Sequence, residues 1–423
     1  MIELLVVVFL VTMFMGVPLA FCTLLGSIAY IWSTGRLPYE VAPQQIFHGL
    51  DHFTFLAIPM FVLAGELMNH GGITRRLIAC VQAFVGHLRG GLAYVSVVTN
   101  LLMAGISGSA LADAAGTGSV LIPAMRRAGY PTPFAAAVIS AASTIGPVIP
   151  PSIPFILYAT IAGVSVGKMF AAGALPGVLM GIGFLALVGF LGRRADFPKE
   201  ARSSLRQVVR AFVDAGFALV MPLIILGGIL LGIFTATEAA SIAVVYALAV
   251  SMLVYREVKP RDLMRILYET GISSAVIMFV IGAAGLLSWV INFSQVAQQL
   301  SVILSALEVG PGILLLLMAL LLIFLGCFME ASPLIIIMTP VLLPAAKSAG
   351  IDPVHFGLVM VLTLMIGLIT PPVGMVLFIT AGIGRIGMIE VARACVPFIL
   401  VILAITVLAI FVPGWVMWLP NLV

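Results

Sequence analysis

An internal repeat constrains the fold of this chain more than any other feature of its sequence. Residues 105–151 align without a gap with residues 326–372, which lie 221 positions later, and 13 of the 47 aligned residues are identical. The shared residues include a double proline, Pro150-Pro151 in the first copy and Pro371-Pro372 in the second. Because both copies place helix-breaking residues inside apolar sequence, the pattern is typical of a secondary transporter whose site lies between the repeats.

The composition places these repeats in a membrane. Of the 423 residues, 62% are hydrophobic and only 9% are charged, whereas a soluble domain carries about 25% charged residues. No hydrophilic stretch is long enough for a separate soluble domain, so we predict an all-α polytopic membrane protein. The apolar run from Leu4 to Trp32 is too long for the core of a signal peptide and follows Glu3 instead of a basic region, so we expect it to remain as membrane structure.

The charged residues and the cysteines disfavour two classes of function. Beyond two short linkers the sequence shows no basic surface, which excludes nucleic-acid binding despite the net charge of +4. The four cysteines lie far apart and in no metal-binding or redox spacing. We expect them to pack between helices, and we expect no cofactor.

Two segments differ from the ordinary spans, which need about 20 apolar residues. Segments 91–127 and 311–346 are too long for one upright span and short for two, and each has a small or polar break near its middle. We predict that both are re-entrant helical hairpins, whose non-helical tips are allowed at depth when protein or water surrounds them. Ordinary spans are predicted at 2–33, 52–72, 131–165, 168–192, 213–234, 236–255, 270–292, 353–384 and 394–418.

The distribution of basic residues tests this topology. Two linkers, 193–210 and 256–265, hold ten of the twenty Lys and Arg residues, and positive charge favours the cytoplasmic side. If both linkers are cytoplasmic and both hairpins re-enter, 17 basic residues fall inside and only Arg36, Lys168 and Lys347 fall outside. The first hairpin then opens to the cytoplasm and the second to the outside, so we predict that the repeats are inverted.

The N-terminal segment has two possible forms. Residues 4–32 could form one tilted span that starts in the cytoplasm, or two short spans broken at Gly16-Val17-Pro18 with the terminus outside. We favour the second form because the equivalent place in the second half, 213–255, also holds a pair of spans. Segments 74–88 and 295–308 alternate apolar with charged or amide residues, so we expect surface helices that join each hairpin to the span before it.

A proline-rich break interrupts the span that follows each hairpin. The sequence reads GPVIPPSIP from Gly146 and GLITPPVG from Gly367. Proline removes a backbone donor and clashes with the preceding turn, so both helices should unwind near the middle of the membrane. The freed carbonyls and half-helix ends, with nearby hydroxyls, can bind a hard cation such as Na+, whereas a lone proline would indicate an ordinary kink.

Acidic residues stand in apolar sequence at both hairpin tips. Asp113 follows Ser107 and Ser109 in the first tip, and Glu330 precedes Ser332 in the second. An ionised side chain near the bilayer centre costs about 2.5–3.5 kcal/mol, so we expect both acids to serve a partner or a pathway. The alternative is that each acid caps the returning helix.

Other polar residues have local explanations. Thr235 and Glu238 have the spacing of a capping box in an outer turn. Glu66 lies near the inner end of its span and should reach the interface. We expect the five histidines at span ends to be interfacial instead of forming a proton relay; they are His48, His52, His70, His87 and His355.

An enzyme and a channel are the other classes of function to weigh. Gly105-Ile106-Ser107-Gly108 resembles the motif around the serine of rhomboid intramembrane proteases, but no histidine is predicted at the same depth to activate that serine. We therefore expect no enzyme activity. A channel would need only a pore, whereas inverted repeats with broken helices are typical of alternating access.

Several strings resemble the large membrane subunit, of DctM type, of tripartite ATP-independent periplasmic (TRAP) transporters. They are SGSALAD, LIPAMRRAGY, STIGPVIPPSIP, AIPMFVLAGELMNHGGITRRL, GHLRGGLA, FTATEAA and GLITPPVG, which extend the resemblance over essentially the whole chain. The resemblance implies a Na+-coupled elevator transporter of the bacterial inner membrane, which receives an organic acid from a soluble periplasmic binding protein. It also implies a small four-span membrane subunit as partner. A stand-alone Na+/carboxylate symporter of the related superfamily is the alternative, because it shares the hairpins and broken helices.

The resemblance also implies the site residues. One Na+ site is assigned to Ser107, Ser109, Gly146 and Pro150, and a second to Glu330, Ser332, Thr370 and Gly374. The substrate is expected between the tips, near Ser107, Asp113, Pro151, Ser152 and Pro372. The second tip is more apolar than the first, so its ion site should rest largely on backbone carbonyls, and Glu330 could be a cap or gate instead of a ligand.

The expected organisation alternates scaffold with transport elements. Residues 91–165 and 311–385 are the two transport repeats, each a hairpin with its broken helix. The scaffold comprises residues 1–90 with the first surface helix, 166–310 with the two basic linkers and the second surface helix, and 386–423 with the last span.

Overall fold

The computed structural model describes residues 2–35, 37–194, 197, 201–295 and 309–422. Within these ranges every regular element is a helix, which confirms the all-α prediction. Seven helices of the described part are long and apolar enough to cross a membrane: Phe53–His70, Val166–Arg193, Leu205–Leu230, Ala236–Val254, Pro260–Phe293, Ala331–Ser348 and Met388–Phe411. The chain is therefore a multi-pass membrane protein.

The N-terminal segment forms two helices instead of one long span. Helix α1 (Ile2–Phe14) and helix α2 (Leu19–Thr34) are separated by a turn in which Gly16 has a φ of +80°. Pro18 directly precedes α2, where its missing N–H leaves no helical hydrogen bond unmade. The break thus lies at the predicted Gly16-Val17-Pro18.

Three further helices complete the first part of the chain. They are α3 (Val41–Leu50), α4 (Ala57–His70), which follows a 3-10 turn at Phe53–Leu56, and α5 (Ile73–Val85). Helix α5 coincides with the first predicted surface segment, 74–88. The second, 295–308, lies outside the described residues except for Gln295.

The two repeats contain the same four helices in the same order. The first comprises α6 (Gly91–Ser107), α7 (Ala110–Arg127), α8 (Thr132–Ser143) and α9 (Ile153–Ala162). The second comprises α15 (Pro311–Gly326), α16 (Ala331–Ser348), α17 (Pro353–Leu368) and α18 (Met375–Gly384). Each predicted hairpin is therefore a pair of helices, and each proline break separates two helices.

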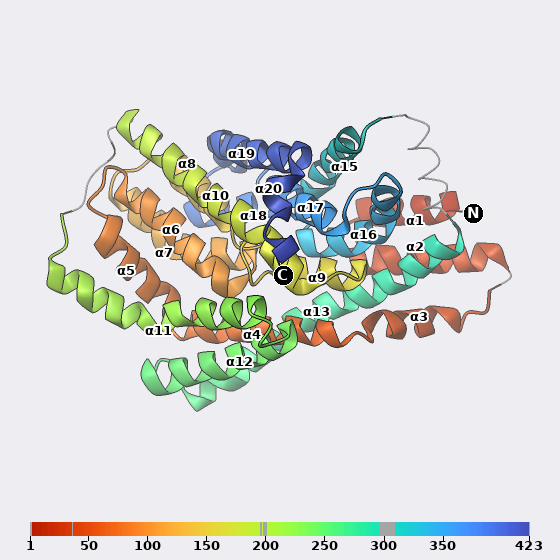
Figure 1. Cartoon of the computed structure of the whole chain (residues 1–423), viewed down its shortest axis with the longest axis horizontal. Coiled ribbons are helices and arrows are strands. Elements are labelled where there is room, and N and C mark those ends of the chain that lie inside the picture. The colour runs from red at the N-terminus through yellow and green to blue at the C-terminus, as the bar shows by residue number, and fades with distance from the viewer. Residues whose placement is uncertain (1, 36, 195–196, 198–200, 296–308, 423) are drawn as a thin grey trace.

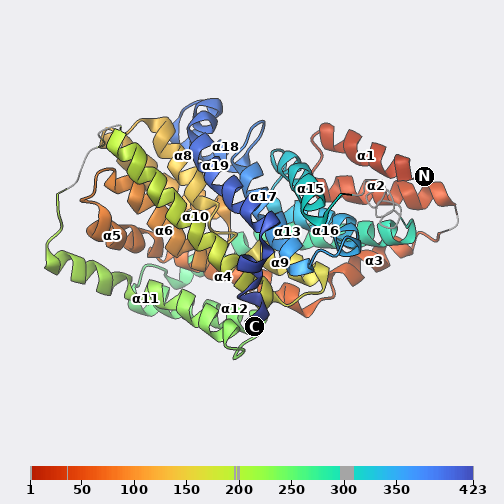
Figure 2. The ribbon, with the colours of Figure 1, turned by 45° about the horizontal axis from the view of Figure 1, so that its top comes forward.

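The repeats interlock into one bundle. Helix α9 packs against α16, and α18 packs against α7 and α8. The hydroxyl oxygens of Ser140 on α8 and Thr380 on α18 are 2.7 Å apart, and the Tyr158 hydroxyl on α9 donates to the Pro353 carbonyl on α17. Figure 1 shows α9, α17 and α18 near the centre of the view, and Figure 2 shows α9 and α17 there with α18 nearer the top.

The remaining helices surround this bundle. They are α10 (Val166–Arg194), α11 (Leu205–Leu230), α12 (Ala236–Ala249), α13 (Pro260–Phe293), α19 (Met388–Phe411) and α20 (Pro413–Met417). Helix α12 packs on α4, and α13 packs on α2, α3 and α4. The predicted capping box begins α12, because the Thr235 side chain accepts from the Glu238 N–H while Glu238 accepts from the Thr235 N–H.

His355 departs from the expected interfacial position. It lies in the first turn of α17 and is only 6% exposed. Its Nε2 lies 2.8 Å from the Ala409 carbonyl oxygen on α19. This hydrogen bond gives the buried ring a partner inside the protein, so His355 does not need to reach the membrane interface.

Candidate functional site

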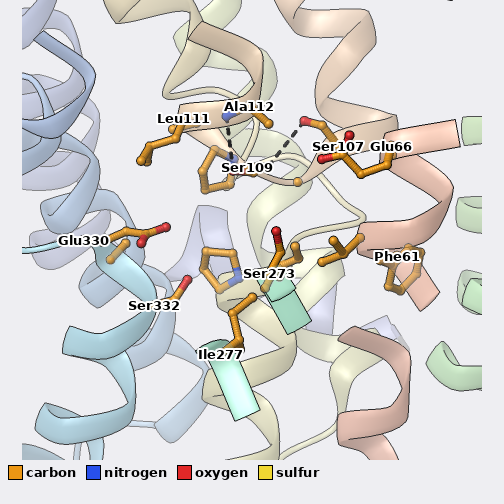
Figure 3. A pocket seen from close by; sticks show the side chains of 18 of the residues that line it. Phe61, Glu66, Ser107, Ser109, Leu111, Ala112, Ser273, Ile277, Glu330 and Ser332 are labelled. Carbon is orange, nitrogen blue, oxygen red and sulfur yellow. Dashed lines mark hydrogen bonds between the residues drawn. The ribbon is translucent and has the colours of Figure 1, made fainter. Parts of the chain in front are cut away.

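A pocket of about 400 Å³ lies where the two hairpin tips meet the scaffold helices α4 and α13. Figure 3 shows Ser107 and Ser109 from the first tip opposite Glu330 and Ser332 from the second, with Phe61 and Glu66 of α4 and Ser273 and Ile277 of α13 completing the wall. Pro147, Ile153 and Pro154 bring the first proline break to the same pocket, and Leu368 brings the end of α17. The repeat interface therefore contains a site of ligand size.

The first tip is held by hydrogen bonds within its own turn. Gly108 takes a φ of +58°, which lets the chain reverse between α6 and α7. Ser109 is the N-cap of α7, because its hydroxyl accepts from the Ala112 N–H at 3.4 Å. The Ser107 hydroxyl donates to Oδ1 of Asp113 at 2.6 Å. The helix is thus capped by Ser109, and the alternative that Asp113 is the cap is wrong.

Asp113 keeps one carboxylate oxygen without a hydrogen bond. The residue is 1% exposed, and its Oδ2 has no partner in the described chain. A Cβ added at Gly146 would lie 2.5 Å from Oδ2, so the carboxylate faces the backbone of the first break at close range. A buried carboxylate oxygen is costly unless it is paired or binds a cation. Asp113 therefore brings a carboxyl group with one unpartnered oxygen to the junction of the first tip and the first break.

The first break also contacts the first tip through its backbone. A Cβ added at Gly108 would lie 2.7 Å from the Pro151 carbonyl oxygen. Ser152 is the N-cap of α9: its hydroxyl accepts from the Phe155 N–H at 3.3 Å and donates to the Pro147 carbonyl. The Ser152 hydroxyl is thus engaged locally, while the Pro151 carbonyl lies beside Gly108 of the tip.

The second tip joins its break by direct main-chain hydrogen bonds. The N–H groups of Val373 and Gly374 both donate to the Cys327 carbonyl, at 3.1 and 3.0 Å. A Cβ on Gly367 would lie 2.5 Å from the carbonyl carbon of Gly326, so only glycine allows this approach. The Thr370 hydroxyl donates to the Ile366 carbonyl at 2.6 Å, which leaves its lone pairs free to accept.

Glu330 points into the pocket instead of capping its helix. It occupies the N-cap position of α16, but its side chain makes no capping hydrogen bond. Figure 3 shows its carboxylate directed across the pocket, with Ser332 below it. The structure therefore does not support the capping alternative for Glu330.

Four of the residues assigned from the sequence line the pocket, namely Ser107, Ser109, Glu330 and Ser332. The others, which do not line it, are Asp113, Gly146, Pro150, Pro151, Ser152, Thr370, Pro372 and Gly374. Asp113 and Gly146 adjoin each other behind Ser107, and Gly374 contacts the second tip. Both Pro-Pro peptide bonds are cis.

Sequence reasoning missed the contribution of the scaffold. Glu66, Asn69 and Ser273 line the pocket, although Glu66 was expected at the interface. A polar residue inside an apolar span is a signal for such a role, and the pair Ser273-Ser274 in the middle of α13 carried that signal.

The charges around the pocket are all of one sign. Glu66 and Glu330 are its two charged lining residues, and none of the residues that line it is Lys, Arg or His. The remaining polar lining comes from serines and Asn69. Such a wall can accept hydrogen bonds and hold cations, but it offers no cationic side chain to a bound anion.

Comparison with known proteins assigns residues 6–415 to the model of the DctM component of tripartite ATP-independent periplasmic transporters. The chain is 37% identical to the 2,3-diketo-L-gulonate TRAP transporter large permease YiaN of Escherichia coli, over 94% of each chain. It is 37% identical to the sialic acid large permease SiaM of Vibrio cholerae, over 97% of this chain and 96% of SiaM. It is 39% identical to the C4-dicarboxylate large permease DctM of Pseudomonas aeruginosa, over 89% of this chain and 88% of that permease.

Two solved transporter structures share the fold. The Alcanivorax borkumensis YdaH transporter superposes with a TM-score of 0.63 at 19% identity, over 93% of this chain and 88% of YdaH. Neisseria gonorrhoeae MtrF, described as one of a class of antimetabolite efflux pumps, superposes with a TM-score of 0.62 at 12% identity. The superposition covers 88% of this chain and 83% of MtrF. At these identities the likeness concerns the fold alone.

Proposed function

Because the chain belongs to the DctM family of TRAP transporters and is a large permease subunit for organic acids, we propose that it couples the import of its substrate to Na+. One observation carries this proposal. The pocket has acidic and neutral walls, and the buried Asp113 beside it keeps an oxygen without a partner. A carboxylate substrate enters such a site only when cations offset the negative charge.

The first Na+ binds at the junction of the first tip and the first break. Asp113 supplies the charge, Ser107 and Ser109 supply hydroxyl oxygens, and the chain around Gly146 and Pro150 supplies carbonyls. The close approach of the Asp113 carboxylate to Gly146 supports this position. Na+ is a hard cation, and oxygen ligands of these types suit it.

The second Na+ binds where the second tip meets its break. Thr370, Gly374 and the carbonyls of the break provide oxygens, and Glu330 with Ser332 closes the site from the tip. The two hydrogen bonds to the Cys327 carbonyl support this junction as a rigid unit. The substrate then lies between the tips, near Ser107, Ser152 and Pro372, with Asp113 and Pro151 behind it.

Transport follows an elevator mechanism. The two repeats pack on each other through α9 with α16 and α18 with α7 and α8, while the rest of the pocket wall comes from α4 and α13. This division supports a transport bundle that moves against a scaffold. With both ions and the substrate bound, the tips close and the bundle carries its cargo across.

The chain works with two partner proteins at the bacterial inner membrane. A small four-span membrane subunit packs against the scaffold, and a soluble periplasmic binding protein delivers the organic acid. The names of the relatives, which include permeases for a diketo sugar acid, sialic acid and C4-dicarboxylates, support an organic acid as substrate.

Uptake by proteoliposomes that contain the large and small subunits and receive loaded binding protein tests the proposal. Asp113→Ala, and separately the double replacement of Ser107 and Ser109 by Ala, should abolish Na+-dependent uptake. Ser119→Ala is the matched control, because Ser119 lies further along α7, is exposed and bonds only to its own helix. Full Na+ dependence in the Asp113→Ala protein would refute the ion assignment.

A further inference from the structure

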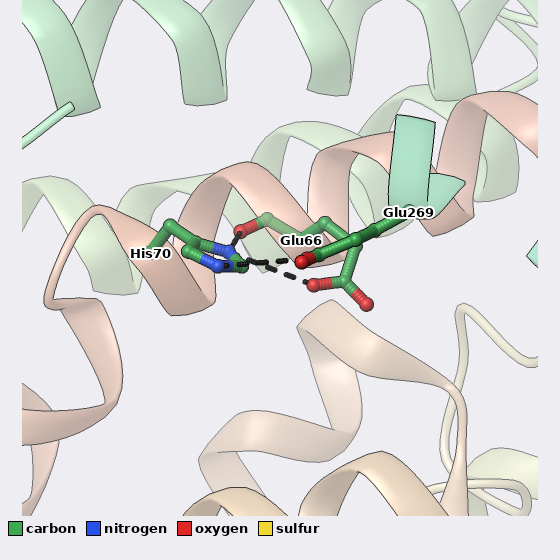
Figure 4. A group of neighbouring side chains, drawn as sticks. All are labelled: Glu66, His70 and Glu269. Carbon is green, nitrogen blue, oxygen red and sulfur yellow. Dashed lines mark hydrogen bonds and ion pairs between the residues drawn. The ribbon is translucent and has the colours of Figure 1, made fainter. Parts of the chain in front are cut away.

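A second group of polar side chains lies beside the pocket, where α4 meets α13. Glu66 and His70 lie one turn apart on α4, and Glu269 comes from α13; Figure 4 shows the His70 ring directed toward both carboxylates. One ligand-type atom from each residue lies within 4.8 Å of the other two. The side chains are 31%, 35% and 36% exposed, so ions can reach them from water.

The hydrogen bond of the His70 ring decides which nitrogen is available. Nδ1 lies 3.0 Å from the main-chain carbonyl oxygen of Glu66. A carbonyl can only accept, so Nδ1 carries the hydrogen, and Nε2 of the neutral ring holds a lone pair. Nε2 faces Oε2 of Glu269 at 3.7 Å. A metal ion bound at Nε2 would take the place of the proton through which the imidazolium form of His70 pairs with Glu269.

The carboxylates are oriented to take part. Oε1 of Glu269 accepts from Nε of Arg265 at 2.7 Å, which leaves Oε2 directed at His70. Oε2 of Glu66 lies 3.6 Å from Nδ1 of His70, so this carboxylate must turn to share an ion with Nε2. A histidine that donates its other N–H to a backbone carbonyl, beside a carboxylate held by a second residue, is the arrangement that orients ligands around protein metal ions.

We propose that Glu66, His70 and Glu269 bind a divalent transition-metal ion of the zinc class. Zn2+ accepts one imidazole nitrogen and two carboxylate oxygens at about 2.0–2.2 Å, and three protein ligands leave a fourth position open. Ligand atoms of a tetrahedral zinc site are about 3.3 Å apart. The ligand atoms of the three side chains lie within 4.8 Å of one another, so binding requires a change of rotamer at these partly exposed residues.

A metal ion bound at this cluster also changes the wall of the pocket. Glu66 belongs both to the cluster and to the pocket wall. A bound ion joins α4 to α13 and draws the Glu66 carboxylate to itself, which removes one negative charge from the wall. Metal binding at this cluster does not depend on the proposed Na+ coupling.

Isothermal titration of the purified, chelator-treated full-length protein with Zn2+ tests the site. We expect one wild-type site that His70→Gln and Glu269→Gln each weaken at least tenfold, while Ca2+ binds far more weakly because it prefers all-oxygen sites. His87→Gln is the matched control and should keep the wild-type affinity. Zn2+ should also raise the melting temperature of the wild type and not that of His70→Gln, whose melting temperature without metal checks its folding.

Three results would overturn the proposal. They are the absence of Zn2+ binding to the wild type, an unchanged affinity in both cluster variants, and an equal loss of affinity in His87→Gln. Because each readout is binding to the isolated subunit, failure here is distinguishable from failure of Na+-coupled uptake.

Discussion

Replacing Gly146 by Ala perturbs the first ion site without removing any of its ligands. The added Cβ would lie 2.5 Å from Oδ2 of Asp113 and 3.3 Å from the Ser143 carbonyl oxygen. Gly146 has no left-handed φ, so Ala fits its backbone and only the space beside Asp113 changes. The methyl group therefore takes the place where we propose that the Asp113 oxygen meets Na+.

The expected loss of Na+ affinity follows from the hydrogen bond that the added methyl group weakens. Asp113 can move only by weakening its 2.6 Å hydrogen bond from Ser107, because Oδ1 accepts that bond. Hydrogen bonds to charged groups are worth about 1.5–3 kcal/mol. That range corresponds to a fall in Na+ affinity of about ten- to a hundredfold.

The half-saturating Na+ concentration for uptake by proteoliposomes measures this fall. Gly382→Ala is the matched control, because its Cβ would meet no atom of the described chain within 4 Å, and it should keep the wild-type value. A Gly146→Ala value within twofold of wild type, alongside the loss of Na+-dependent uptake in Asp113→Ala, would refute the reasoning that Na+ lies between Asp113 and the break.

Three further outcomes are expected. Gly367→Ala forces a Cβ to 2.5 Å from the carbonyl carbon of Gly326, so the melting temperature should fall by the equivalent of about 1–3 kcal/mol; a melting temperature equal to that of Gly382→Ala would contradict this contact. Glu330→Gln should leave the melting temperature unchanged, since the side chain caps nothing, yet raise the half-saturating Na+ concentration about tenfold; an unchanged Na+ requirement would remove Glu330 from the second site. Cysteines introduced at Arg202 and Lys347 should react with an impermeant reagent from opposite sides of the membrane, and labelling from the same side would disprove the inverted topology.

Helix-breaking and helix-capping residues made much of the architecture predictable. The double prolines shared by the two copies predicted both breaks, because two adjacent prolines remove two backbone donors, whereas single prolines such as Pro123 and Pro344 lie inside helices. Thr235 and Glu238 predicted the start of α12, since a capping box is a local interaction within four residues. Gly16 and Pro18 predicted the position of the N-terminal break, whereas the choice of two spans rested on the pair of spans at 213–255.

The pocket wall was less predictable because it depends on contacts between distant segments. Glu66 and Ser273 line the same pocket from α4 and α13. The local sequence of each helix does not predict that these two helices pack against each other. His355 was expected at the interface, and only the partner carbonyl of Ala409 explains its burial. Likewise, Asp113 was the candidate cap in the sequence, and the fold shows that Ser109 caps α7 instead.

Equilibrium binding of radioactive Na+ to the purified subunit tests the central claim most directly. The wild type should bind Na+ saturably at two sites, and Asp113→Asn should lose one of them while Asp214→Asn, an exposed aspartate of α11, keeps both. Absence of saturable Na+ binding to the wild type, or an Asp113→Asn protein that binds Na+ as the wild type does, would contradict the account.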